Sequence, residues 1–147
     1  MSLTVRKLEA GDEAGWRRLW AGYLAFYRAE LAEATTAEIF ARLVKGEPHF
    51  AFVAECDGAL AGFVHALPHA STWALEGYCY LEDLFVDSSV RGAGIGRALI
   101  EAVYEEAERR GLSRVYWHTE EGNATARRLY DRVATLSEFI QYRHAKH

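Results

Sequence analysis

The 147-residue sequence is poor in cysteine and proline, with two residues of each. Cys56 and Cys79 lack the C-x-x-C spacing of a zinc or redox site, and disulfide frameworks use more cysteines in shorter chains. We therefore expect both cysteines to be ordinary core residues in a reducing compartment. With 50% hydrophobic and 26% charged residues, the composition also excludes disorder as the dominant state.

Long apolar runs and basic clusters are missing as well. No stretch approaches the roughly 18 apolar residues of a membrane span, and charge follows the amino terminus at Arg6 and Lys7. The net charge is −4, and no group of Lys and Arg is long enough to follow a phosphate backbone. We expect a cytoplasmic protein that binds neither nucleic acid nor membrane.

The length predicts a single domain over residues 1–147, because domains commonly have about 100–150 residues. A domain of this size removes roughly 68–70% of its unfolded surface from water, so it needs no metal to hold it together. No metal is expected, and the sequence contains neither internal repeats nor low-complexity linkers.

The first 46 residues predict a short strand and two helices. The strand covers residues 5–8, and Asp12 stands where its carboxylate can cap the helix that follows. A second helix is expected over 36–44, with Gly46 at its end. The first helix carries more rings than a narrow face can bury, so some are expected to line a pocket. Its apolar residues are Trp16, Leu19, Trp20, Tyr23, Leu24, Phe26 and Tyr27.

The middle of the chain reads as antiparallel sheet. Strands are predicted over 50–56 and 59–67, joined by a tight turn at Asp57-Gly58. A loop is expected over 68–76, followed by a strand over 77–86.

Apolar residues recur at helical spacing from Ile95 until Gly111, and a strand is predicted over 114–119. With the strand over 77–86 they form a strand–helix–strand unit, whose two strands should be parallel. Asn123 is placed to cap a further helix that reaches about Val133, and a last strand is predicted over 139–142. The predicted fold class is α/β (α+β), a mixed sheet with an antiparallel meander and about four flanking helices.

A glycine-rich turn, Arg91-Gly92-Ala93-Gly94-Ile95-Gly96, joins a predicted strand to a predicted helix. Helix-start amides lack intrahelical partners, and glycine lets an anion approach them closely. A P-loop would need Lys and Ser or Thr after its last glycine, and a dinucleotide fold would need G-x-G-x-x-G, so neither motif fits. A tight connection with no ligand is the remaining alternative.

In this context the turn is similar to the R/Q-x-x-G-x-G/A acyl-CoA motif of the GNAT superfamily of N-acetyltransferases. The segment Tyr80-Leu-Glu-Asp-Leu-Phe-Val86 resembles the strand before that motif, notably in diamine and polyamine acetyltransferases and in histone-type members. Asn-Ala-Thr-Ala-Arg-Arg-Leu-Tyr, residues 123–130, resembles the family's N-x-x-A-x-x-x-Y helix. The resemblance covers about residues 50 to 133.

The resemblance implies the GNAT acyl-CoA N-acyltransferase fold, acetyl-CoA as co-substrate and a possible homodimer. It implies that the backbone of Leu84, Phe85 and Val86 pairs with the pantetheine arm, that Asn123 contacts that arm, and that Tyr130 lies near the sulfur. The expected pyrophosphate-binding residues are Arg91, Gly92, Ala93, Gly94, Ile95, Gly96 and Arg97.

Acetyl transfer requires a neutral amine, and deprotonating an alkyl ammonium of pKa about 10.4 at neutral pH costs roughly 4.6 kcal/mol. Glu82 resembles the general-base position of polyamine acetyltransferases, with His118 or water as alternatives. Regular strand alternation places Glu82 and its neighbour Asp83 on opposite faces, so the two are not expected to act together. Tyr130 is the candidate acid for the leaving thiolate.

The expected function is transfer of the acetyl group to a primary amine of a small, polyamine- or diamine-like molecule, directly within a ternary complex. Alternatives are a protein lysine or N-terminal amine as acceptor, or a non-catalytic acyl-CoA-binding regulatory module. Aromatic rings and carboxylates suit a cationic acceptor. The predicted acceptor-binding residues are Tyr27, Glu82, Tyr116, Trp117 and His118, with Tyr23, Phe26, Trp73, Tyr78, Glu76, Glu120 and Glu121 as further candidates.

Overall fold

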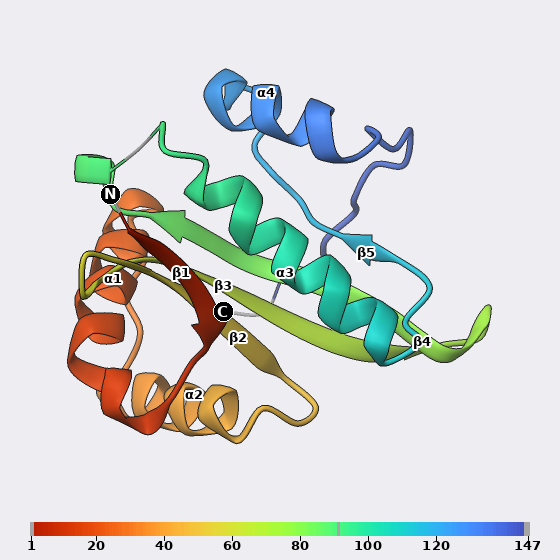
Figure 1. Ribbon diagram of the computed structural model, residues 1–147. Helices are drawn as coiled ribbons and strands as arrows, with labels where there is room; N and C mark the ends of the chain where they lie inside the picture. The colour runs from red at the N-terminus through yellow and green to blue at the C-terminus, as the bar shows by residue number, and fades with distance from the viewer. Residues whose placement is uncertain (1, 91, 146–147) are drawn as a thin grey trace.

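The computed structural model describes residues 2–90 and 92–145, and five strands within them form one sheet in the order β1-β2-β3-β4-β5 (Figure 1). The first four strands pair antiparallel, whereas β5 pairs parallel with β4. The predicted meander and strand–helix–strand unit are therefore confirmed. The strands are β1 (Leu3–Lys7), β2 (Phe50–Cys56), β3 (Ala59–Ser71), β4 (Ala74–Val86) and β5 (Val115–Tyr116).

Helices cover both faces of this sheet (Figure 1). Helices α1 and α2 lie on one face, while α3 lies on the other and α4 packs beside α3. Four α-helices flank the sheet, as expected. They are α1 (Glu13–Phe26), α2 (Glu33–Lys45), α3 (Ile95–Arg109) and α4 (Ala124–Val133), with short 3-10 turns η1 (Ala10–Asp12) and η2 (Ser88–Val90).

Two hydrophobic clusters hold these layers together. Under α3, Leu99 and Val103 pack on Leu81 and the free thiols Cys56 and Cys79, all buried. Between the sheet and α1–α2, the buried cluster is unusually aromatic, and its rings are Trp16, Trp20, Phe40 and Phe63. Most rings of the α1 stripe are thus core, but Phe26 and Tyr27 at the end of the helix stay exposed.

The loop predicted over 68–76 is wrong, because β3 and β4 continue as one long hairpin in which Ser71 pairs with Ala74. Pro68 suggested a loop because proline donates no ladder hydrogen bond. In the structure Pro68 pairs with Cys79 of β4. It lies beyond Ala66, which is the last β3 residue that pairs with β2. One side of β3 is free there, which is where a strand tolerates proline.

The chain after α4 also departs from expectation. Residues 134–145 contain no strand, so the strand predicted over 139–142 is wrong, and β5 has two residues in place of the expected six. Leu136, Phe139, Ile140 and Tyr142 are exposed. An extended segment becomes a strand only when a neighbour satisfies its backbone groups. Nothing in the described part of the chain pairs with this segment.

Asp12 stands directly before α1 but does not cap it with its side chain. Its carboxylate instead accepts two hydrogen bonds from the Arg6 guanidinium, at 2.8 and 2.9 Å, and one from the Glu9 amide at 2.8 Å. Hydrogen bonding to Arg6 holds the pKa of Asp12 below its usual value. The Asp12 carboxylate therefore pairs with the bidentate, charged Arg6 guanidinium in preference to the helix amides.

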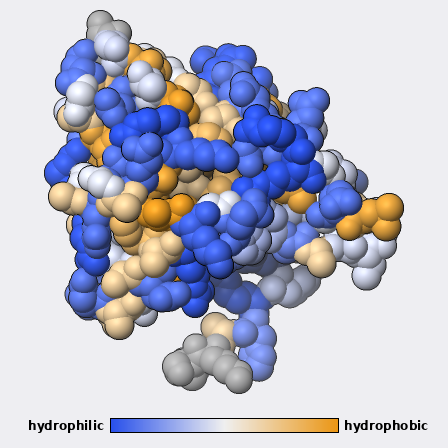
Figure 2. All heavy atoms as spheres, turned by 60° about the horizontal axis from the view of Figure 1, so that its bottom comes forward, coloured by the Kyte–Doolittle hydropathy of each residue, from blue (hydrophilic) through white to orange (hydrophobic). Residues whose placement is uncertain are grey.

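The other expected turns are confirmed. Gly46 and Gly111 adopt positive φ at the ends of α2 and α3, and Asp57-Gly58 has positive φ at both central positions of the β2–β3 hairpin, as its type of turn requires. None of the helices formed by the described residues is long and apolar enough to cross a membrane. Seen from below the view of Figure 1, the surface is mostly hydrophilic, with apolar side chains showing in separate areas (Figure 2).

Candidate active site

The glycine-rich turn brings β4 to the start of α3. Gly94 precedes the helix with φ of 77°, and the first helical hydrogen bond runs from the Ala98 amide to its carbonyl at 3.1 Å. The amides of Ile95, Gly96 and Arg97 therefore point out of the helix, and no side chain of the described residues caps them. This end of α3 presents N–H donors and the positive end of the helix dipole.

Open space lies in front of these amides. A Cβ built on Gly92 or Gly94 would meet nothing within 4 Å, and both residues have positive φ. At Gly96, in contrast, a Cβ would lie 3.2 Å from Leu129 of α4. The first two glycines thus shape an open cradle, whereas Gly96 lets two helices approach each other. The cradle fits a diphosphate. Arg91, also predicted to bind it, lies outside the described residues.

The edge of β4 that faces β5 is open next to this cradle. Pairing between the two strands covers only Cys79–Val115 and Tyr80–Tyr116, although β4 continues to Val86. Leu84, Phe85 and Val86 are paired with β3 on their other side. Their remaining backbone groups can pair with an extended, amide-containing arm, as the sequence predicts for pantetheine.

Helix α4 carries the next two predicted residues. Asn123 caps the helix, accepting a hydrogen bond from the Ala126 amide at 3.3 Å, which leaves its side-chain NH₂ group as a donor. Tyr130 is partly buried and packs edge-on against Trp117, with ring centroids 5.3 Å apart. Burial, and then the neighbouring Tyr27 phenol, raise the pKa of Tyr130. Tyr130 therefore keeps its proton at neutral pH, as a general acid must.

A β-bulge in β4 holds the two acidic residues. His65 of β3 pairs with Asp83 and the next residue, Ala66, pairs with Leu81, so Glu82 is the extra residue. Leu81 and Leu84 both pack under α3 although they are three positions apart. Glu82 and Asp83 must therefore both point to the opposite face, toward α1. The expectation that they lie on opposite faces is wrong, because the bulge interrupts strand alternation.

Glu82 and Asp83 thus form a carboxylate pair on one face of the sheet. Glu82 is an exposed residue, but partial burial of its carboxyl raises its pKa, the charge of Asp83 raises it further, and a hydrogen bond with Tyr80 opposes both effects. A raised pKa brings a carboxylate nearer to that of the amine it must deprotonate. The sheet thus gives Glu82 a raised pKa beside a second carboxylate.

A buried chain of hydrogen bonds ends at Asp83, and the sequence analysis did not predict it. His65 Nδ1 lies 2.8 Å from Asp83 Oδ2, and Trp16 donates from Nε1 to His65 Nε2 at 3.0 Å. Phe63 stacks on the imidazole with ring centroids 4.4 Å apart. No local motif signals this chain, since Trp16 and His65 are 49 residues apart and Asp83 meets His65 only through the register of β3 and β4.

The predicted acceptor residues divide between the two faces. Tyr116 stacks on Tyr80 at 5.1 Å between ring centroids, and the Tyr80 hydroxyl lies 3.1 Å from His118 Nδ1. These side chains lie on the face that carries the carboxylate pair. Trp117 instead packs against Tyr104 and Tyr130 beside the α3 core. The structure therefore does not bring Trp117 together with Tyr116 and His118.

Tyr27, the residue that follows α1, is partly exposed at 45% and packs edge-on against Tyr23. Burial raises the pKa of both phenols, and the charge of Asp83 contributes to each shift. The end of α1 therefore brings the Tyr23 and Tyr27 phenols near Asp83.

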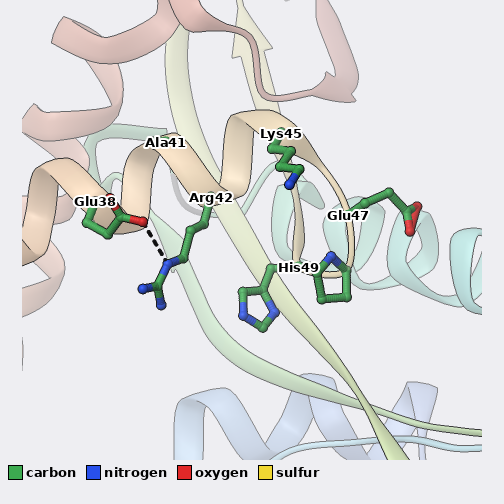
Figure 3. Close-up of a pocket in the computed structure, with 7 residues that line it drawn as sticks. Glu38, Ala41, Arg42, Lys45, Glu47 and His49 are labelled. Carbon is green, nitrogen blue, oxygen red and sulfur yellow. Dashed lines mark hydrogen bonds and ion pairs between the residues drawn. The ribbon is translucent and has the colours of Figure 1, made fainter.

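A pocket lies elsewhere, between α2 and the segment before β2 (Figure 3). It has a volume of about 450 Å³, and the Arg42–Glu38 ion pair of 3.0 Å lies along it. None of its lining residues belongs to the predicted site. The residues that line it are Glu38, Ala41, Arg42, Lys45, Glu47, Pro48 and His49. In the described part of the chain, no group of three or more His, Cys, Asp or Glu side chains could hold a metal ion.

Two curated relatives match over most of their length. A D-amino-acid N-acetyltransferase of Saccharomyces cerevisiae is 36% identical over 96% of this chain and 89% of its own. An uncharacterized N-acetyltransferase of Bacillus subtilis is 31% identical over 88% of this chain and 87% of its own.

Solved structures share the fold at low sequence identity. A ribosomal-protein-alanine N-acetyltransferase of Brucella melitensis superposes with a TM-score of 0.83 at 23% identity, covering 99% of this chain and 100% of that one. The aminoglycoside N-acetyltransferase AAC(6')-Iy, bound to a bisubstrate analogue of CoA, superposes with a TM-score of 0.86 at 17% identity, covering 99% of both chains.

A family model, described as the Acetyltransferase (GNAT) family, matches residues 16–134, which include the glycine turn, the bulge and α4. The fold, this match and the curated relatives agree, and they rule against a purely regulatory acyl-CoA-binding module. The chain therefore belongs to the GNAT family of acetyltransferases, and it is an N-acetyltransferase that uses acetyl-CoA as its acetyl donor.

Proposed function

We propose that this enzyme acetylates a primary amine of a small cationic molecule, with Glu82 as general base and Tyr130 as general acid. The observation that carries the proposal is the bulge, which sets two carboxylates on the face that α1 covers, beside the open edge of β4. A diamine or polyamine presents its positive charges to such a pair.

The reaction needs no covalent enzyme intermediate. Glu82 takes a proton from the bound ammonium, the freed amine nitrogen attacks the thioester carbonyl carbon, and the C–S bond breaks as the N–C bond forms. The Tyr130 hydroxyl gives its proton to the departing thiolate, and the surplus proton on the acylated nitrogen restores the Tyr130 hydroxyl. Burial raises the pKa of Cys79 to about 11, so this thiol is protonated and does not serve as a nucleophile.

The donor half of the site is built from main chain. We assign the pyrophosphate to the amides from Gly92 to Arg97 and the pantetheine arm to the edge of Leu84, Phe85 and Val86, with Asn123 contacting the arm. The support is the open cradle before α3 and the unpaired edge of β4. Acetyl-CoA supplies the activated acyl group, and these residues orient it.

A D-amino acid is the second candidate acceptor, favoured by the yeast relative that matches nearly the whole chain. Such an acceptor carries a carboxylate beside its amine, and this needs a cationic partner. Burial and the charges of Glu82 and Asp83 raise the pKa of Tyr80, and the charge of Arg143, in the segment after α4, opposes them with the smallest contribution. The segment after α4 thus supplies a guanidinium on the acceptor side.

A thiol-release assay with acetyl-CoA tests catalysis and acceptor class together. The panel contains putrescine, spermidine, L-ornithine, D- and L-amino acids, an aminoglycoside and a lysine-containing peptide. We expect the highest kcat/KM with an acceptor carrying at least two amines. A preference for D-amino acids establishes the second candidate, and a preference for the peptide overturns both in favour of a protein acceptor.

A further inference from the structure

We propose that Trp16, His65 and Asp83 form a positioning chain for acetyl transfer: the indole fixes the imidazole tautomer, the imidazole donates to Asp83 and orients its carboxylate, and Asp83 places its negative charge beside Glu82. None of the three is a catalytic residue in this scheme, since they act through Glu82. The inference rests on the proposed role of Glu82 as the base.

The direction of each hydrogen bond follows from the chemistry of the groups. An indole nitrogen can only donate, so His65 Nε2, at 3.0 Å from Trp16 Nε1, must accept. The ring proton then sits on Nδ1 and is donated to Asp83 Oδ2 at 2.8 Å. Asp83 accepts this bond and needs no proton of its own.

The surroundings of His65 hold its ring in place. The residue is 2% exposed, and its ring lies among those of Trp16, Trp20 and Phe63, at centroid distances from 4.4 to 5.9 Å. A ring nitrogen that carries a proton cannot accept from the indole, so Nε2 must be bare. The aromatic cluster under α1 and the indole hydrogen bond thus fix one orientation and one tautomer of the imidazole.

Asp83 transmits this arrangement to Glu82. Because the bulge points both carboxylates toward α1, the charge on Asp83 disfavours the ionised form of Glu82 and strengthens it as a base. Titratable or charged groups from α1, β3, β4, β5 and the chain after α4 face this pair. Besides the two carboxylates these are Tyr23, Tyr27, His65, Tyr80 and Tyr116, with His118 bonded to Tyr80 and the charge of Arg143 acting on Tyr80.

A matched pair of tryptophan variants distinguishes the effect of the hydrogen-bonded chain from the effect of aromatic packing. Trp16→Phe removes the indole N–H that bonds His65, whereas Trp20→Phe, in the same cluster, removes an N–H that has no hydrogen-bond partner among the described residues. We expect both variants to lose similar stability. Only Trp16→Phe should move the midpoint of the acidic limb of kcat/KM, by about half a pH unit downward. The reason is that weaker repulsion between the charges of Asp83 and Glu82 makes Glu82 easier to ionise.

Replacements of His65 test the middle of the chain. In His65→Asn the amide nitrogen can occupy the place of Nδ1 and still donate to Asp83, whereas His65→Leu cannot donate. We expect His65→Leu to lower the acidic-limb midpoint further than Trp16→Phe, and His65→Asn to restore most of the wild-type profile. Equal profiles for the Leu and Asn variants contradict the chain.

Nitrogen-15 NMR of the imidazoles in the full chain supplies a readout that does not depend on activity. At neutral pH we expect His65 with a protonated Nδ1 and a bare Nε2, changing in Trp16→Phe but not in Trp20→Phe. A protonated Nε2 in the wild type overturns the chain.

The Glu82→Gln variant distinguishes the two failures. If its acidic limb persists, the assignment of Glu82 as the base fails, and with it the effect of Asp83 on that base. If the limb disappears in Glu82→Gln yet is unmoved in Trp16→Phe and His65→Leu, the base stands and the positioning chain fails.

Discussion

The two ends of the proposed site are formed by different kinds of chemical group, main-chain groups at one end and side chains at the other. At the end of β4, the glycine turn offers main-chain amides, positive φ angles and open space beside Gly92 and Gly94. In the middle of β4, the bulge offers two carboxylates supported by rings from β3 and α1. The donor half depends on backbone shape, whereas the acceptor half depends on side-chain charge.

This contrast explains how one fold can serve many acceptors. Every acetyl-CoA carries the same diphosphate and pantetheine, so a backbone cradle can remain as it is while acceptors change. Acceptor choice and amine deprotonation need charges at chosen places, and these come from side chains that neighbouring strands and helices bring together. Substitutions in the two halves should therefore affect different kinetic constants.

The largest effect is expected at the bulge. Glu82→Gln removes the base, and kcat/KM for the amine should fall by about 10²–10⁴-fold, the usual contribution of general acid–base catalysis, with its acidic limb flattened. The KM for acetyl-CoA should hardly change, because the donor half is intact. Steady-state kinetics across pH measure both constants, with Glu38→Gln on α2 as a matched control. A wild-type profile in Glu82→Gln assigns the base to His118 or water.

A smaller loss is expected at Tyr130, which stands between the two halves. Tyr130→Phe removes the acid but keeps the ring against Trp117, and a thiolate with a pKa near 8.5 is a tolerable leaving group. We expect kcat to fall by about 10²-fold, the low end for such catalysis, with acetyl-CoA affinity retained. Rapid-mixing kinetics and calorimetry measure these quantities. Tyr142→Phe, at a 92% exposed tyrosine, is the control, and an unchanged kcat rejects the acid role.

The glycine turn should show the opposite pattern. Gly94→Ala forces a Cβ into the left-handed region, which costs about 1–2 kcal/mol, and places it at the cradle. Acetyl-CoA binding should weaken by about tenfold, while the pH profile of the acceptor reaction keeps its shape. Calorimetric titration with acetyl-CoA tests this. Gly122→Ala, where a Cβ also meets nothing within 4 Å, should bind normally, and equal affinities would mean that the turn does not touch the donor.

The smallest effect is expected at Cys79, on the same strand but facing the α3 core. Cys79→Ala should leave kcat within about twofold and cost roughly 1 kcal/mol of stability, a typical value for a point substitution. Activity and thermal unfolding assays measure this. A large loss of activity, or an acetylated Cys79 trapped with acetyl-CoA alone, would contradict direct transfer.

Several features of this protein follow from local sequence. Gly46 and Gly111 end helices, Asp57-Gly58 makes a hairpin, and Asn123 caps α4, because each depends on the conformational freedom or hydrogen bonding of neighbouring residues only. The glycine turn belongs to the same class. Its position between a strand and a helix can be recognised without any tertiary contact, so the turn itself could be predicted.

The tertiary structure decided the rest. Pro68 lies within a strand because β2 does not extend alongside that part of β3. Residues 139–142 stay irregular because the described chain offers them no partner. The bulge at Glu82 turns both carboxylates to one face, and Trp16 meets His65 across 49 residues. Strand pairing and packing between distant segments determine such contacts, and no spacing along the chain encodes them.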